Sequence, residues 1–306
     1  MGTFTRRGFI GTTLSAGLAL ATGGCALTQP HKRIVVDTQV HLWKANSPDL
    51  PWAPGGKPPA PEPLTIERWL VEMDNAGVDR VIVVPPVLTG FNNSYSLDAA
   101  RRYPTRFAVM GRVALRDPKA PGLLPAWKQQ PGMLGVRLGL LNDPKVLTDG
   151  SADWFWPAAE KAGIPVMLQA PETGPLLSRI AERHPQLILI IDHMGLSVPV
   201  VKAGRRAAAV DHVLSLAKYP NCSVKLSGAP AYSFERYPWR DVDPEIRRLF
   251  DAYGPRRCYW GADPTNSWGA ATYTERVTHL EHLDFMTASD RDWIMGRAIL
   301  ERLKWA

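Results

Sequence analysis

The stretch Leu187–Gly195, LILIIDHMG, decides the fold that this sequence favours. An unbroken apolar run ends abruptly in Asp192 and His193. A strand that is apolar on both faces is typical of a parallel sheet covered by helices. Because the run is short and bounded by polar residues, we interpret it as one buried strand and search the chain for others of its kind.

Seven further runs of this type occur, and amphipathic segments separate them. The expected strands are Ile34–Trp43, Val78–Val87, Arg106–Val113, Met133–Leu140, Pro165–Ala170, Leu187–Asp192, Cys222–Ser227 and Arg257–Gly261. The expected helices are 65–77, 94–103, 121–130, 152–162, 175–184, 206–218 and 244–253, with two more near 274–283 and 287–303. Eight strands alternating with helices predict a single α/β domain, a (β/α)8 TIM barrel over residues 34–306. A doubly wound open sheet is disfavoured, since no glycine-rich phosphate turn follows the first strand, DTQVHLW.

Composition is that of an ordinary globular protein, with 45% hydrophobic and 21% charged residues among 306. The net charge of +7 can steer a small anionic substrate. Nucleic acid is not expected as a partner, because no dense stripe of lysine and arginine occurs. Three cysteines without CxxC spacing exclude a zinc ribbon, and we expect Cys222 and Cys258 to be buried thiols.

The amino terminus has the features of an export signal. Arg6 and Arg7 precede a short apolar stretch, Ile10–Ala21, which resembles the twin-arginine signal of folded bacterial exports. Cys25 follows two glycines and is a candidate for lipidation, so residues 1–33 are interpreted as a signal peptide and tether. We therefore expect a periplasmic location by the twin-arginine route, with a membrane tether through Cys25 as the alternative to a free protein.

Polar side chains gather where the expected strands end, which is where barrels of this kind hold their active sites. These residues are Asp37, Gln39, His41, Arg137, Gln169, Asp192, His193, Lys225, Ser227 and Asp263. A single histidine at a strand end is most often a hydrogen-bonded core residue. Two histidines and an aspartate at the same end of different strands instead favour a catalytic cluster. No G-x-S-x-G motif is present, so a nucleophilic serine is not expected.

The segments VVDTQVHLW, GVRLGL, IDHMG, SVKLSG and YWGADP, taken in order, resemble the amidohydrolase-2 branch of the amidohydrolase superfamily. The likeness covers about residues 34–305 and is nearest to the lactonases, such as the 2-pyrone-4,6-dicarboxylate lactonases. This resemblance implies that Asp263 activates water, that His193 and His41 polarise a lactone carbonyl, and that Arg137 binds a substrate carboxylate.

The same resemblance makes Asn93 and Tyr95 expected substrate contacts. We also assign Gln39 and Lys225 to the substrate-binding set, and a salt-bridged position inside the barrel is the alternative for Lys225. The expected function is therefore a hydrolase that opens a small, carboxylated lactone by means of Asp-activated water. The oligomeric state does not follow from the sequence.

The sequence departs from the family pattern at the expected metal ligands. The first strand has Gln39 where a His-x-His motif is usual, and the fifth has Gln169 where metal-using relatives carry histidine. Amide oxygens are poor zinc ligands, so we expect no tightly bound metal. Weak Zn²⁺ binding by His41, His193 and Asp263 is the alternative.

Two other functions remain open at this point. One is a metal-dependent decarboxylase or amidohydrolase of the same branch, although the stretch Asp37–Gln39 lacks the E-x-H pattern usual for decarboxylation. The other is a catalytically degenerate periplasmic binding protein, which the loss of a family histidine makes credible. Chelator-sensitive release of CO2 would indicate the first function, and binding without turnover the second.

Overall fold

The computed structural model describes residues 1–3, 33–141 and 143–306. The predicted twin-arginine signal and Cys25 lie outside the described residues, so export and lipidation stay predictions. Residues Arg33–Ala306 form one compact unit. Within the described part of the chain, no helix is both long and apolar enough to cross a lipid bilayer.

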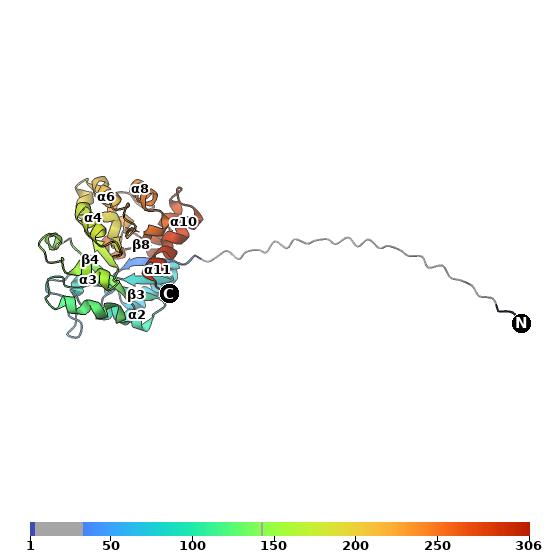
Figure 1. Ribbon diagram of the computed structural model, residues 1–306, viewed down its shortest axis with the longest axis horizontal. Coiled ribbons are helices and arrows are strands. Elements are labelled where there is room, and N and C mark those ends of the chain that lie inside the picture. Colours follow the sequence, from blue (N-terminus) through green and yellow to red (C-terminus); the bar gives the residue numbers. More distant parts are fainter. Residues whose placement is uncertain (4–32, 142) are drawn as a thin grey trace. The chain divides into compact units, whose positions relative to one another are not determined.

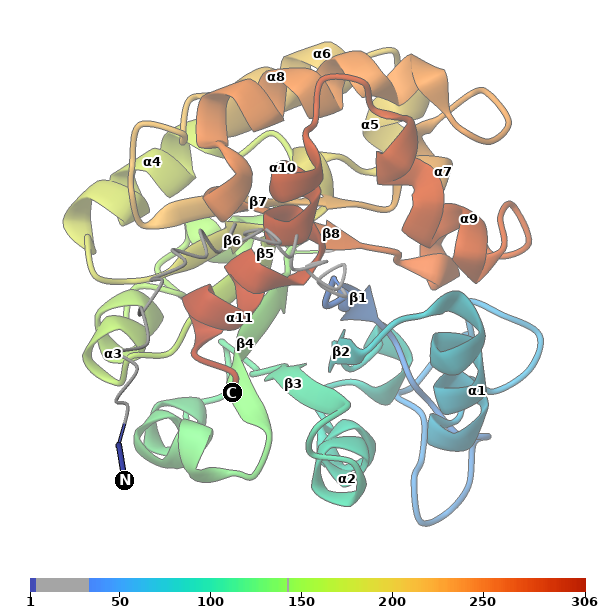
Figure 2. The ribbon, with the colours of Figure 1, turned by 90° about the vertical axis from the view of Figure 1, so that its right-hand side faces the viewer.

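Helices lie around a core of strands (Figure 1), and the eight parallel strands follow one another in sequence order around a ring (Figure 2). They are β1 Val36–Val40, β2 Arg80–Val83, β3 Phe107–Gly111, β4 Met133–Gly139, β5 Val166–Gln169, β6 Leu189–Ile191, β7 Cys222–Ser227 and β8 Cys258–Gly261. Each predicted strand is found, although most are shorter than predicted. The predicted (β/α)8 barrel is confirmed.

Hydrogen bonds between β1 and β8 close the ring where no regular ladder joins the two strands. The backbone N–H of Asp263 donates to the Gln39 carbonyl at 3.0 Å, and the Thr38 hydroxyl donates to the Trp260 carbonyl at 2.6 Å. The Asp37 carboxylate accepts the backbone N–H of Ala262 at 2.9 Å. Asp37 is therefore a structural residue, which is one of the roles that its position suggests.

Helices surround the strands (Figure 2). They are α1 Ile66–Ala76, α2 Ser94–Arg102, α3 Phe155–Lys161, α4 Gly174–Arg183, α5 Val198–Lys202, α6 Arg206–Leu214, α7 Ala229–Tyr232, α8 Asp243–Tyr253, α9 Tyr273–Thr278, α10 Ala288–Asp292 and α11 Ala298–Leu303. The predicted helix 121–130 is instead a 3₁₀ helix, Ala120–Gln129, because Pro125 inside it removes a backbone donor. The helices α5 and α7 were not predicted, since five and four residues are too few to show a helical period.

The carboxyl-terminal helix covers the end of the barrel where the strands begin. Ile299 and Leu303 of α11 belong to the same buried cluster as Val36 and Tyr259, which lie near the starts of β1 and β8. Figure 2 shows α11 lying across the ring of strands. Since this end is filled, the accessible end of the barrel is the one where the strands finish.

Cys222 and Cys258 are buried free thiols, as predicted. Burial raises the pKa of Cys222 to about 12, and it raises the pKa of Cys258 further. Both thiols therefore stay protonated at neutral pH and serve as small apolar side chains.

Candidate active site

A cavity of about 220 Å³, called here the catalytic cavity, opens at the carboxyl ends of the strands. It is lined by His41, Lys57, Pro59, Pro86, Val87, Leu88, Arg137, Gln169, His193, Asp263, Thr265 and Asn266. Parallel strands bring their carboxyl ends to one side of the barrel, so residues distant in sequence meet there. Four of the predicted site residues, His41, Arg137, His193 and Asp263, line this cavity together.

Asp263 stands between the two histidines. Its Oδ1 lies 3.8 Å from His41 Nε2, and its Oδ2 lies 3.6 Å from His193 Nδ1. The residue follows β8 in a left-handed conformation, with φ of 44°, which is unusual for a residue other than glycine and typical of strained functional positions. Burial raises the pKa of Asp263 to about 6, although Lys225 and Arg137 oppose that shift. Its carboxylate is therefore ionised and unusually basic at neutral pH.

His41 has its hydrogen bonds fixed on both ring nitrogens. Nδ1 lies 2.7 Å from the carbonyl oxygen of Val84, which can only accept, so Nδ1 carries the proton. Nε2 then accepts a hydrogen bond from the Gln39 amide at 3.2 Å. Burial and the nearby Arg137 lower the pKa of His41 to about 3, so the ring is neutral. Its Nε2 is an acceptor, which does not suit the predicted role of polarising a carbonyl.

His193 reaches the cavity because the chain turns sharply at the end of β6. His193 and Met194 both adopt left-handed conformations, with φ of 56° and 58°. Gly195 continues this turn, and a Cβ there would lie 2.3 Å from a Val213 methyl group. His193 Nδ1 lies 2.9 Å from the Ser227 hydroxyl oxygen. Burial lowers its pKa to about 3, although Asp192 opposes the shift, so this ring is neutral as well.

Asp192 points into the barrel, although the alternation of side chains along a strand would place it on the face opposite His193. Its Oδ2 accepts the Arg137 Nε–H at 3.0 Å, and its Oδ1 lies 3.1 Å from Lys225 Nζ. The strand ends at Ile191, so the alternation that separates neighbouring side chains no longer applies to Asp192 and His193. Burial alone would raise the pKa of Asp192, but Lys225 and Arg137 outweigh it and hold the pKa low.

Gln39 and Lys225 do not line the catalytic cavity. Lys225 is fully buried and donates to the Gln39 side-chain oxygen, while the Gln39 amide contacts His41. A chain of contacts thus runs from Asp192 through Lys225 and Gln39 to His41. The contacts of Lys225 favour a salt-bridged position inside the barrel over a contact with substrate. Lys225 and Gln39 together fix the orientation of the His41 ring.

The predicted contacts Asn93 and Tyr95 also lie away from the lining of the catalytic cavity. The Asn93 side chain bonds the backbone of Arg112 twice, at 2.8 and 3.0 Å. Tyr95 is buried, and its hydroxyl accepts the backbone N–H of Ile66 at 3.0 Å. The side chains that we predicted as substrate contacts thus hold the loops around the site.

Arg112 is a functional candidate that our sequence reasoning missed. It follows β3 directly, and a period of two places it on the same face as Met110, which points into the barrel. That periodicity could have identified it. The predicted strand Arg106–Val113 contains Arg112 before its end, whereas the predicted site residues are those that end a strand.

The donor set does not fit a divalent metal ion. Among the described residues, no group of three or more histidine, cysteine, aspartate or glutamate side chains is arranged to hold a metal. Burial lowers the pKa of His41 and of His193, and the nearby cations Arg137 and Lys225 lower both further, although Asp192 opposes the shift at His193. No catalytic step is therefore assigned to a metal.

Comparisons with known proteins agree with this fold. The family model described as amidohydrolase matches residues 36–298. L-fucono-1,5-lactonase of Burkholderia ambifaria is 29% identical over 74% of this chain and 79% of its own, and 4-sulfomuconolactone hydrolase of Hydrogenophaga intermedia is 28% identical over 74% and 73%. A crystal structure of a probable 2-pyrone-4,6-dicarboxylic acid hydrolase from Acinetobacter baumannii, with citric acid bound, shares the fold with a TM-score of 0.70. It is 21% identical and covers 88% of this chain and 99% of its own.

Proposed function

This chain belongs to the amidohydrolase family, and on that premise we propose that it is a hydrolase that opens a small lactone carrying a carboxylate. Two relatives at 28–29% identity are named for lactone substrates, which supports a cyclic ester as the target. One observation carries the proposal: the basic carboxylate of Asp263 lies between two neutral imidazoles in a cavity that also contains a guanidinium group.

Asp263 is the proposed general base. Its carboxylate takes a proton from a water molecule, and the water oxygen attacks the lactone carbonyl carbon. The bond between this carbon and the ring oxygen then breaks, and the proton returns from Asp263 to the departing ring oxygen. Water and lactone are thus converted into one hydroxycarboxylic acid, without a covalent enzyme intermediate.

The two histidines have different proposed roles. We assign to His41 Nε2, which lies 3.8 Å from Asp263, the second hydrogen of the attacking water, which takes the place of the Gln39 amide at the single lone pair of this nitrogen. We assign to His193 the stabilisation of the oxyanion that develops on the lactone carbonyl oxygen. If the Ser227 hydroxyl donates to Nδ1, the ring proton lies on Nε2, which can donate to the carbonyl oxygen as charge builds on it.

Arg137 is the proposed binding residue for the carboxylate. Its Nε and one terminal nitrogen are held by Asp192 and Gln169, which fixes the plane of the guanidinium group. The other terminal nitrogen, Nη1, has no hydrogen bond to any described residue and remains for a ligand. Arginine recognises carboxylates more strongly than a neutral donor does, because the hydrogen bond is charge-assisted.

Paraconate, a butyrolactone that carries one carboxylate, distinguishes this function from the alternatives. We expect hydrolysis of paraconate to exceed that of uncharged γ-butyrolactone at equal concentration, and to be unchanged after exhaustive treatment with a chelator. pH-stat titration measures the reaction. Chelator-sensitive activity restored by Zn²⁺ would favour the metal-dependent alternative, release of CO2 would favour decarboxylation, and paraconate binding without turnover would favour a binding protein.

Activity is expected to depend on pH through Asp263. The base acts only when ionised, and its pKa is raised to about 6, so kcat/KM should rise with pH and level off above that value. Both histidines are neutral throughout this range, since their pKa values are about 3, and they add no second inflection. Initial rates of paraconate hydrolysis, corrected for the reaction without enzyme, provide the profile. A profile that stays flat through pH 6 would exclude Asp263 as the titrating base.

A further inference from the structure

A second cavity of about 200 Å³, called here the side cavity, shares Arg137 with the catalytic cavity. It is lined by Phe91, Arg112, Val113, Ala114, Leu115, Arg116, Arg137, Leu138, Gly139, Leu140, Asp143 and Val146. These residues belong to β4 and to the segments that follow β2, β3 and β4. Nothing in the proposed lactone reaction uses this space.

Arg112 enters the side cavity without a counter-charge. Its Nε and Nη1 are buried and have no hydrogen-bond partner among the described residues. Its guanidinium lies 5.5 Å from the centre of the Phe91 ring, and Asn93 holds its backbone in place. A buried donor left unpaired costs about 1–3 kcal/mol, and more when it is charged, so an unpaired guanidinium here indicates a site for an acceptor.

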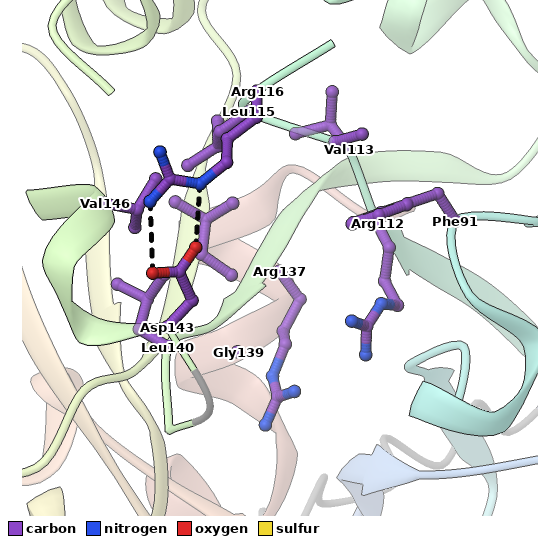
Figure 3. A pocket seen from close by; sticks show the side chains of 12 residues that line it. Phe91, Arg112, Val113, Leu115, Arg116, Arg137, Gly139, Leu140, Asp143 and Val146 are labelled. Atoms are coloured by element: carbon purple, nitrogen blue, oxygen red, sulfur yellow. Dashed lines mark hydrogen bonds and ion pairs between the residues drawn. The ribbon is translucent and has the colours of Figure 1, made fainter. Parts of the chain in front are cut away.

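The neighbouring arginine, Arg116, is by contrast paired with carboxylates. Arg116 grips Asp143 with two nitrogens, at 2.8 and 3.1 Å, and reaches Asp149 at 2.7 Å. Figure 3 shows Arg116 turned to Asp143, while Arg112 and Arg137 extend side by side in the same direction. Burial and the nearby Arg137 lower the pKa of Arg112 to about 10, so Arg112 stays charged at neutral pH although Arg137 repels it.

Apart from Arg112, Arg137 and the ion pair of Arg116 with Asp143, the side cavity is lined by apolar residues. Leu115, Leu138, Leu140 and Val146 are all buried side chains that line it. Figure 3 shows Leu115, Leu140 and Val146 on the side of Arg137 away from Arg112. A ligand whose anionic group meets the arginines can therefore place an adjoining apolar group against these side chains.

We propose that the side cavity selects substrates that are anionic and also carry an apolar substituent, with the carboxylate shared by Arg112 and Arg137 and the substituent among Leu115, Leu140 and Val146. The proposal rests on the proposed function and names the class of its substrate: an amphiphilic lactone acid rather than a polar sugar lactone. The added substituent takes no part in bond breaking, so it contributes to affinity.

The binding of simple carboxylates tests the proposal without any turnover. Isothermal titration of the full chain with acetate, butyrate and hexanoate is expected to give affinities that rise by about fourfold for each methylene group buried. Hexan-1-ol, which lacks the charge, is expected not to bind. Arg112→Met should weaken hexanoate binding by about tenfold or more, since the carboxylate loses a charge-assisted partner. Arg179→Met, at an exposed position on α4, removes the same charge as a matched control and should leave binding unchanged.

A second variant separates the apolar part of the site from the charged part. Val146→Phe fills the apolar end of the side cavity and is expected to weaken hexanoate binding while leaving acetate binding unchanged. Equal affinities for acetate and hexanoate, or hexanoate binding that Arg112→Met leaves intact, would overturn the proposal. If hexanoate binds as expected but neither paraconate nor its alkylated derivatives are hydrolysed, the lactonase function fails and the site remains.

Discussion

Asp263→Asn is expected to lower kcat/KM for paraconate by a factor of about 10²–10⁴, the usual contribution of a general base. The amide has nearly the same shape as the carboxylate but cannot accept a proton from water. The two imidazoles that flank residue 263 cannot replace the carboxylate as the base. Their pKa values are about 3, whereas that of Asp263 is about 6, so they are weaker proton acceptors. The residual activity should also lose its inflection near pH 6.

The matched control is Asp284→Asn, because Asp284 is exposed and loses the same charge. Its kcat/KM should equal that of the wild type. Melting temperatures of both variants establish that they are folded. An Asp263→Asn protein that is folded and retains more than about a tenth of the wild-type rate would contradict the assignment of Asp263 as the base.

Asp37→Ala is expected to lower the free energy of unfolding by about 3–5 kcal/mol. The Asp37 carboxylate accepts the backbone N–H groups of Gln39 and Ala262 and the hydroxyl of Tyr273, each at 2.9 Å. All three donors would be left buried without a partner. Because two of these bonds join β1 to β8 and its following helix, their loss opens the barrel at its seam, immediately before Asp263.

Urea denaturation followed by circular dichroism measures this effect. Asp284→Ala removes an exposed carboxylate and should change the free energy of unfolding by no more than about 0.5 kcal/mol. If Asp37→Ala were as stable as Asp284→Ala, the Asp37 carboxylate would not be needed to hold β1 against β8. A stable Asp37→Ala protein with lowered activity would instead give Asp37 a role in positioning Asp263.

The barrel could be predicted because its strands are apolar on both faces and end in polar residues. The apolar run ending in Asp192 and His193 shows this pattern most clearly, and β6 lies within it. Two features were beyond this reasoning. Proline inside 120–129 changed the type of helix, and the seam between β1 and β8 depends on side-chain bonds from Asp37 and Thr38 rather than on a periodic pattern.

The residues of the candidate site could be predicted only where the position of a residue in its strand determines which way its side chain points. His41, Arg137, His193 and Asp263 meet because each lies at or near the carboxyl end of a strand. The tautomers of the histidines and the partners of the charged side chains could not be predicted. The proton of His41 lies on Nδ1 because of the Val84 carbonyl, which is 43 residues away in the sequence. Asn93 and Tyr95 were assigned by resemblance, and their side chains bond to backbone around the site instead.

A crystal structure of the Asp263→Asn protein with intact paraconate bound tests the central claim most directly. The account predicts that the ligand carboxylate contacts Arg137 and that the lactone carbonyl carbon faces residue 263, with one water molecule between them. A lactone ring bound outside the catalytic cavity, or a carbonyl group turned away from residue 263, would contradict the proposed attack by Asp-activated water.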